Sequence, residues 1–291
     1  MRNPIVPTLF ALTLAACSNG ASTPPTPYVA APIADLAADT PLEVRGNHTG
    51  WWRNNQVPVG QNAVNENGPK LQRLVTTTTA GAYVAVFRNN ITNDNYGRAV
   101  FTMPANGAVV TGTTDQGYKF TITNNNNTLT YTLTGLFSIA TKPGPNAGRY
   151  AYGGYAAGSY TPTADLPTTG SATYTGSFIG QSSVAGLVTG DASITVDFSA
   201  GTNQVSGAIT NISGGGYTIN DLSISATIQG LDSSYSGIVV TGTATGSSAD
   251  FPQGTTGPVD GGLYGPSADE TGGTLRVKNV DNFLTGSFGG N

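Results

Sequence analysis

The side chains that could carry acid–base, nucleophilic or metal chemistry are few in this sequence. His48 is the only histidine and Cys17 the only cysteine among 291 residues. No second protein ligand stands near His48, so we interpret it as a surface or loop residue rather than a haem or metal ligand. No nucleophile elbow or phosphate-binding loop is present, which leaves only paired carboxylates, such as those of Asp191, Asp197, Asp269 and Glu270. Their places in turns and caps favour structural roles, and we expect that the protein is not an enzyme.

Cys17 ends a short apolar leader. One basic residue precedes an apolar run that is too short to span a bilayer, which is typical of a signal peptide over residues 1–16. Leu14-Ala15-Ala16-Cys17 resembles the lipobox of bacterial lipoproteins, which implies lipid transfer to Cys17, cleavage before it and acylation of the new amine. An ordinary secretory signal with a chance cysteine is the alternative. Because Ser18 rather than Asp follows, we expect an outer-membrane anchor, stabilised by about 0.8 kcal/mol per buried methylene.

Residues 17–41 are interpreted as the acylated cysteine and a tether. Five prolines among Ser, Thr and Ala favour an extended segment that could span up to about 75 Å. In the whole chain charged residues make up 10%, Gly contributes 40 residues and the formal charge is −4. Low charge with many short β-branched and aromatic runs favours an all-β protein over disorder. No basic patch is visible, so nucleic acid is not an expected partner.

The stretch Ser267-Ala268-Asp269-Glu270 lies between Gly265-Pro266 and Gly272-Gly273 and has the pattern of a capping box. In such a box the Ser267 hydroxyl accepts from the Glu270 amide, and the Glu270 carboxylate accepts from the Ser267 amide. We therefore expect one capped helical turn between a strand that ends at Tyr264 and a return strand over 274–277. An ordinary hairpin with a long loop is the alternative.

Residues 42–168 are expected to form an antiparallel sheet unit. Short alternating runs predict strands at 71–77, 82–88, 98–103, 118–123 and 128–135, a four-residue hairpin loop at 124–127 and a Tyr/Gly-rich edge at 150–155. Trp51 and Trp52 would point to opposite faces of a strand, so at most one is expected to be wholly buried. Core packing is the default for them. The alternative is that they contact a partner, together with Tyr152 and Tyr155.

Residues 169–291 are expected to form a soluble eight-stranded antiparallel up-and-down β-barrel. Apolar residues alternate along the predicted strands, with Tyr174 and Phe178 on one face of the first, and Ile238 and Val240 on one face of the fifth. The run 175–178 recurs at 285–288, as first and last strands of a closed barrel would be antiparallel neighbours. A transmembrane barrel needs a continuous apolar outer band, whereas here the opposite face is mostly Ser, Thr, Asp and Gln.

The run Gly261–Gly273 resembles the signature near the end of the β-barrel of transferrin-binding protein B-like surface lipoproteins, and 172–178 and 194–198 resemble the opening strands of that barrel. The resemblance implies an N-terminal sheet, the handle (residues 42–168), followed by the barrel (169–291), displayed on a Gram-negative cell. Best-known members have two such lobes, and this chain has room for one. The signature positions, which we interpret as structural, are Gly261, Gly262, Tyr264, Gly265, Pro266, Ala268, Glu270, Gly272 and Gly273.

In that family such lobes bind host iron proteins, haem or complement regulators, and export can need an outer-membrane translocator. We therefore expect an outer-membrane protein, lipid-anchored through Cys17 and facing the cell exterior, that binds an iron-carrying protein or haem. A translocator or a TonB-dependent receptor is a further expected partner. No resident cofactor is expected, because no ligand motif supports haem. The alternative is a structural or protective lipoprotein, in adhesion or immune evasion, with no small-molecule ligand.

Overall fold

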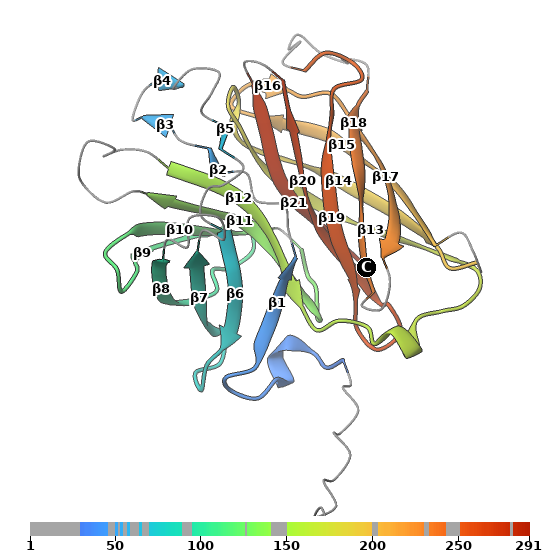
Figure 1. Ribbon diagram of the computed structural model, residues 1–291, viewed down its shortest axis with the longest axis horizontal. Coiled ribbons are helices and arrows are strands. Elements are labelled where there is room, and N and C mark those ends of the chain that lie inside the picture. The colour runs from blue at the N-terminus through green and yellow to red at the C-terminus, as the bar shows by residue number, and fades with distance from the viewer. Residues whose placement is uncertain are drawn as a thin grey trace, which may run out of the picture.

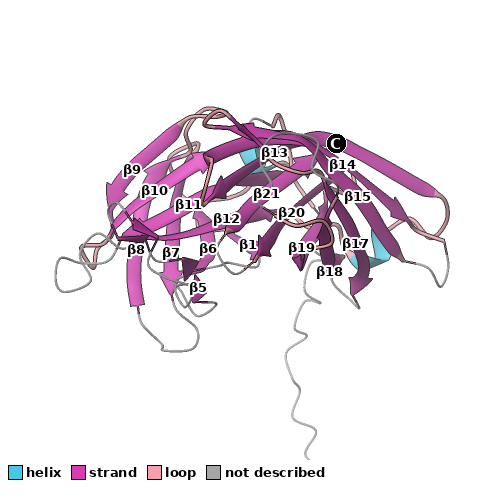
Figure 2. Cartoon of the chain, turned by 90° about the horizontal axis from the view of Figure 1, so that it is seen from above, coloured by secondary structure: helices cyan, strands magenta, loops and turns pink. Residues whose placement is uncertain are grey.

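The computed structural model describes most of the chain from residue 30 onward. Described are residues 30–45, 50–51, 53–54, 57–58, 64–65, 70–88, 95–125, 127–140, 150–199, 203–229, 233–242, 251–279 and 282–291. Within these ranges the fold is all-β, and the helical elements are two single 3₁₀ turns, η1 (Ile33–Asp35) and η2 (Thr163–Asp165). Two large antiparallel sheets lie beside one another (Figure 1, Figure 2).

The first sheet, which we call the handle sheet, has eight strands in the order β8-β7-β6-β1-β12-β11-β10-β9. Its strands are β1 (Pro41–Arg45), β6 (Lys70–Thr76), β7 (Ala82–Arg88), β8 (Asn95–Thr102), β9 (Val109–Thr113), β10 (Lys119–Asn124), β11 (Thr132–Ala140) and β12 (Tyr150–Gly158). Two small ribbons are not hydrogen-bonded into this sheet: β2 (Gly50–Trp51) pairs with β5 (Val64–Asn65), and β3 (Arg53–Asn54) pairs with β4 (Val57–Pro58). Sequence reasoning missed β1 and β9.

The Tyr/Gly-rich strand β12 is central in the handle sheet, so its prediction as an edge is wrong. It pairs with β1 on one side and with β11 on the other. Its glycines serve close packing against the second sheet. A Cβ at Gly154 would stand 2.4 Å from the backbone oxygen of Gly286, so only glycine allows the two backbones to approach here.

The connection from β10 to β11 also differs from the prediction. Strand β10 ends at Asn124 and β11 begins at Thr132, so the expected four-residue hairpin loop and a strand starting at 128 are both wrong. Between the two strands, Asn127, Thr130 and Tyr131 form hydrogen bonds with the second sheet. Asn127 accepts from the Ser177 amide at 2.9 Å, and the amides of Thr130 and Tyr131 donate to Glu270.

The second sheet closes on itself as the predicted eight-stranded antiparallel barrel. The ring runs β13-β14-β15-β17-β18-β19-β20-β21 and returns to β13. Its strands are β13 (Ser171–Ser182), β14 (Gly186–Asp197), β15 (Gln204–Gly214), β17 (Leu222–Gln229), β18 (Ser234–Thr241), β19 (Thr256–Tyr264), β20 (Glu270–Lys278) and β21 (Phe283–Gly290), with the short β16 (Tyr217–Thr218) beside β15. First and last strands are antiparallel neighbours, with Phe178 opposite Phe288.

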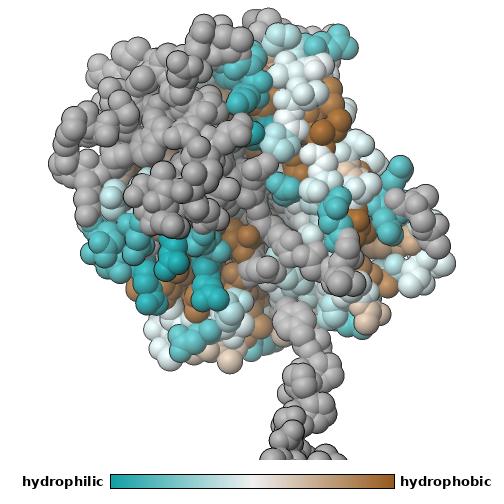
Figure 3. Space-filling view, viewed as in Figure 1, coloured by the Kyte–Doolittle hydropathy of each residue, from teal (hydrophilic) through white to brown (hydrophobic). Residues whose placement is uncertain are grey.

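The barrel interior is the larger hydrophobic core of the chain. Tyr174, Phe178, Ile194, Val205 and Leu222 all contribute to it, as the alternation along their strands predicts. Hydroxyl and other polar side chains occupy the exposed positions between them, and on the face seen in Figure 3 hydrophilic and hydrophobic patches interleave. The buried apolar residues of the handle form a second hydrophobic core.

Strand β18 is the exception to the predicted inward faces. Ile238 is 51% exposed and Val240 is half-buried, whereas Tyr235 and Val239 point into the core. The prediction is wrong by one position, and a slip of one residue exchanges the two faces of a strand. Because β18 carries apolar side chains on both faces, local alternation does not identify the buried one.

Strands β20 and β21 are covered on both faces. Almost every residue of the two is buried, since one face lines the barrel interior and the other lies against β11 and β12 of the handle sheet. The barrel and the handle sheet are thus joined across a broad contact rather than by a linker alone.

Candidate partner-binding surface

The segment Gly265–Glu270 connects β19 to β20, and it is a turn rather than the expected capped helix. Gly265 has φ of 87° and Ala268 φ of 60°, both outside the helical region. The Ser267 amide donates to the Asp269 side chain at 3.3 Å instead of to Glu270. The prediction of a capping box is therefore wrong, because Glu270 has better partners elsewhere.

Glu270 begins β20 and is directed at the handle sheet. One carboxylate oxygen accepts from the Thr130 amide at 2.5 Å and the other from the Tyr131 amide at 2.9 Å. Its side chain is 3% exposed. Glu270 therefore links the barrel to the residues that precede β11, about 140 positions away in the sequence. We call this arrangement the Glu270 latch.

The end of β12 adds further bonds to the same turn. Thr161 donates from its hydroxyl to the Gly265 carbonyl at 2.7 Å, and the Gly265 amide donates to the Ser159 carbonyl at 3.0 Å. Between them the ring of Tyr160 stacks on that of Tyr264, with centroids 5.0 Å apart. Polar and aromatic contacts together hold the turn against the handle sheet.

The glycines of the signature segment stand where a side chain would not fit. A Cβ at Gly261 would lie 2.4 Å from the Tyr235 ring and one at Gly273 2.5 Å from the Phe288 ring, both inside the barrel. A Cβ at Gly272 would lie 2.7 Å from a methyl of Thr132, on the side of the handle sheet. Glycine at these positions allows close packing on both sides of β20 and β19.

Burial controls the titration of this region. Desolvation raises the pKa of Glu270 above its ordinary value, and the hydrogen bonds from Thr130 and Tyr131 oppose that rise. Burial, followed by the charge of Asp269, raises the pKa of Tyr174 to about 12, and the Tyr174 hydroxyl donates to the Ala268 carbonyl at 2.6 Å. Structural contacts hold these side chains in place.

The predicted contact residues differ in burial and position. Tyr152 is half-buried on β12, where its ring lies 6.3 Å from that of Tyr150. The ribbon strand β2, which contains Trp51, lies against β12 (Figure 1), so the strands of Trp51 and Tyr152 are neighbours. Trp52 lies outside the described residues.

The prediction that Tyr155 contacts a partner is wrong. It is fully buried in the handle core, and its hydroxyl lies 3.6 Å from the Met103 sulfur. Burial therefore removes Tyr155 from the candidate contacts.

A groove with both polar and apolar lining lies at the junction of the two sheets. Asn125, Ser177, Asp191 and Asn211 line it, and the carboxylate of Asp191 accepts from the Asn211 amide at 2.7 Å. Asn125 is 1% exposed and donates to the Ser177 carbonyl at 3.0 Å. Sequence reasoning missed these contacts, because a run of four asparagines signals a loop but not what the loop contacts.

Cys17 and His48 lie outside the described residues. Within the described ranges, no group of three or more His, Cys, Asp and Glu side chains could hold a metal ion. None of the helices in the part of the chain that the structure describes is long and apolar enough to cross a membrane.

Comparison with known proteins agrees with this architecture. Residues 166–291 match the family model described as "C-lobe and N-lobe beta barrels of Tf-binding protein B". No curated protein sequence matches the chain.

Solved structures of similar proteins are distant in sequence. Intact Ap-TbpB, with N and C lobes, is 17% identical over 86% of this chain and 60% of its own, with a TM-score of 0.49. TbpB of Neisseria meningitidis is 18% identical over 86% and 57%, with a TM-score of 0.44. The N-lobe domain of lactoferrin binding protein B of Moraxella bovis is 13% identical over 88% and 99%, with a TM-score of 0.36.

The chain thus spans about 60% of the length of the intact TbpB. Its second sheet is a closed eight-stranded barrel, and the family model matches the residues that form it. The likeness to Tf-binding protein B lies in this barrel, at residues 166–291.

Proposed function

We propose that the protein is a non-enzymatic, lipid-anchored protein of the outer-membrane surface that binds an iron-carrying protein or haem. The observation that carries the proposal is the match of residues 166–291 to the barrels of Tf-binding protein B. Anchoring rests on the lipobox-like Leu14-Ala15-Ala16-Cys17.

The architecture supports a binding role in a further way. The handle sheet is held to the barrel by the Glu270 latch and by the bonds of Ser159 and Thr161. A surface that is already ordered loses less entropy when a partner binds. We propose that the partner contacts the side of the handle sheet where β2 and β12 meet, with Trp51, Trp52 and Tyr152 as contact residues.

Surface plasmon resonance tests this proposal. The chain from residue 17 to 291 is immobilised and exposed to transferrin, to lactoferrin, each with and without iron, and to haem. We expect saturable binding of at least one of them. Trp51→Ala and Tyr152→Ala should each weaken it about 30-fold or more, the effect of losing about 2 kcal/mol at an aromatic anchor.

Tyr217→Ala is the matched control. Tyr217 is 44% exposed on β16, at the end of the barrel rather than on the handle sheet, so its loss should leave affinity unchanged. Binding of none of the analytes by folded protein would contradict the proposal. That result would favour the alternative, a structural or protective surface lipoprotein without a small-molecule ligand.

A further inference from the structure

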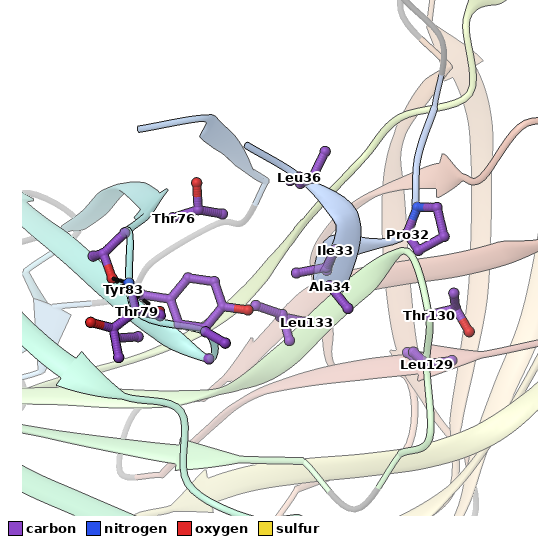
Figure 4. Close-up of a pocket in the computed structure, with 14 residues that line it drawn as sticks. Pro32, Ile33, Ala34, Leu36, Thr76, Thr79, Tyr83, Leu129, Thr130 and Leu133 are labelled. Carbon is purple, nitrogen blue, oxygen red and sulfur yellow. Dashed lines mark hydrogen bonds between the residues drawn. The ribbon is translucent and has the colours of Figure 1, made fainter. Parts of the chain in front are cut away.

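An apolar groove lies where the first described residues meet the handle sheet (Figure 4). Its volume is about 430 Å³, within the range of small-molecule sites. Ile33 of η1 lies on one side of the groove and Tyr83 of β7 on the other, and Leu133 of β11 lies between them. Leu129, which precedes β11, lines the end of the groove near Pro32. Ile33 and Tyr83 are buried, whereas Ala80 on the rim is exposed.

The chemistry of the lining indicates the kind of occupant. Proline, alanine and larger apolar side chains alternate with threonines, and none of the described residues that line the groove carries a charge. A free fatty acid would bring a carboxylate that finds no cationic partner here, and an unpaired charge is costly to desolvate. An acyl chain joined through an amide, ester or thioether carries no such charge.

The position of the groove indicates the source of that acyl chain. Pro32 itself lines the groove, and it lies only fifteen positions after Cys17. A segment of that length reaches about 20 Å as a flexible coil and about 46 Å when fully extended. The entry point is also fixed, because the Ala31 amide donates to the Ser159 hydroxyl at 2.9 Å and the Ile33 amide to the Thr130 carbonyl at 2.9 Å.

We propose that this groove binds one acyl chain carried by Cys17 and shelters it from water while the protein is outside a bilayer. The proposal rests on the lipidation of Cys17 that belongs to the proposed function. A short tether raises the effective concentration of the attached chain to the millimolar range, so even weak intrinsic affinity fills the groove. In a bilayer, acyl chains gain an equally apolar environment, and the groove releases its occupant.

Selective alkylation of Cys17 tests the proposal, because the chain has no other cysteine. The chain from residue 17 to 291 is treated with N-hexadecylmaleimide or with N-ethylmaleimide. The methyl ester of cis-parinaric acid, an uncharged fluorescent acyl chain, is then titrated into each form. We expect one probe molecule to bind the ethyl form, and the hexadecyl form to bind it at least about tenfold more weakly, because the attached chain competes.

Two matched substitutions locate the site. Ala80→Trp fills the groove from its rim and should reduce probe binding by the ethyl form about tenfold. Ala105→Trp, an exposed alanine between β8 and β9 that does not line the groove, should leave binding unchanged.

Equal probe binding by the hexadecyl and ethyl forms would overturn self-occupancy, and so would strong binding by Ala80→Trp or no binding by the ethyl form. These outcomes leave the proposed function intact. Failure of cells to attach radiolabelled palmitate to Cys17 would instead remove the lipid anchor of the proposed function, and this occupant with it.

Discussion

Replacing Glu270 tests how the handle sheet is fixed to the barrel. Glu270→Gln keeps the size of the side chain but turns one of its two acceptor oxygens into a donor. The amide of Thr130 or of Tyr131, which now donate at 2.5 and 2.9 Å, then faces an NH₂ group. A hydrogen bond to a charged acceptor contributes about 1.5–3 kcal/mol, and we take the lower end because the glutamine oxygen still accepts one of the two bonds. We expect Glu270→Gln to lower the free energy of unfolding by about 1.5 kcal/mol.

Urea unfolding followed by circular dichroism measures this effect. With an m-value of about 3 kcal/mol/M for a chain of this size, the midpoint should fall by about 0.5 M. Glu270→Ala removes both acceptors and should lower it by about 1 M. Asp269→Asn is the neighbouring control: its side chain is exposed, and its midpoint should stay within about 0.2 M of the wild type.

Hydrogen exchange shows whether the change lies at the latch. In Glu270→Gln the amides of Thr130 and Tyr131 should exchange faster than in the wild type, while amides in the centre of β14 should respond only to the global loss of stability. An unchanged urea midpoint together with unchanged exchange at 130 and 131 would refute the view that Glu270 holds the two sheets together.

Three further predictions follow from the same junction. Gly272→Ala places a methyl 2.7 Å from a Thr132 methyl and should lower the free energy of unfolding by about 1–3 kcal/mol. Thr132→Ser in the same chain removes that methyl and should recover part of this loss. Additive effects of the two substitutions on the urea midpoint would contradict the clash. Tyr235→Phe removes the 2.9 Å bond to the Thr271 hydroxyl and should lower the melting temperature, through a loss of about 1 kcal/mol; an unchanged temperature would contradict it. The raised pKa of Glu270 means that the folded state holds its proton to higher pH than the unfolded state, whose value lies near 4.5. Its contribution to stability therefore falls as pH rises from about 4.5 through the raised pKa, and Glu270→Gln should flatten this part of the urea-midpoint profile, whereas an identical profile would contradict the assignment.

Most of the barrel could be predicted from the sequence because each strand buries one face. Period-two alternation places Tyr174 and Phe178, or Ile194 and Val196, on the same side, and the structure confirms these faces. Alternation does not identify the buried face of β18, where Ile238 is apolar but exposed. It also could not foresee that β20 and β21 are buried on both faces, since the second face is covered by strands from the other sheet.

The contacts between the handle sheet and the barrel could not be predicted from local sequence patterns. The capping-box pattern offers Glu270 a partner three residues away, but the structure gives it the amides of residues 130 and 131. Likewise, the tyrosines and glycines of β12 suit an edge, and only the packing of Gly154 on Gly286 explains why they lie at the centre of a sheet. Tyrosine is a residue type that often contacts partners, but Tyr155 is buried, because burial depends on the fold rather than on the residue type.

Binding to intact cells tests the central claim most directly. A Gram-negative host that produces the full chain is incubated with fluorescent iron-loaded transferrin, lactoferrin or haem, and cell-bound fluorescence is measured for wild type, Cys17→Ser and Tyr152→Ala. The account predicts saturable binding by wild-type cells, loss of the signal in Cys17→Ser although the protein is still made, and weak binding in Tyr152→Ala. Wild-type cells that bind none of these molecules, while antibodies detect the folded protein at their surface, would contradict it.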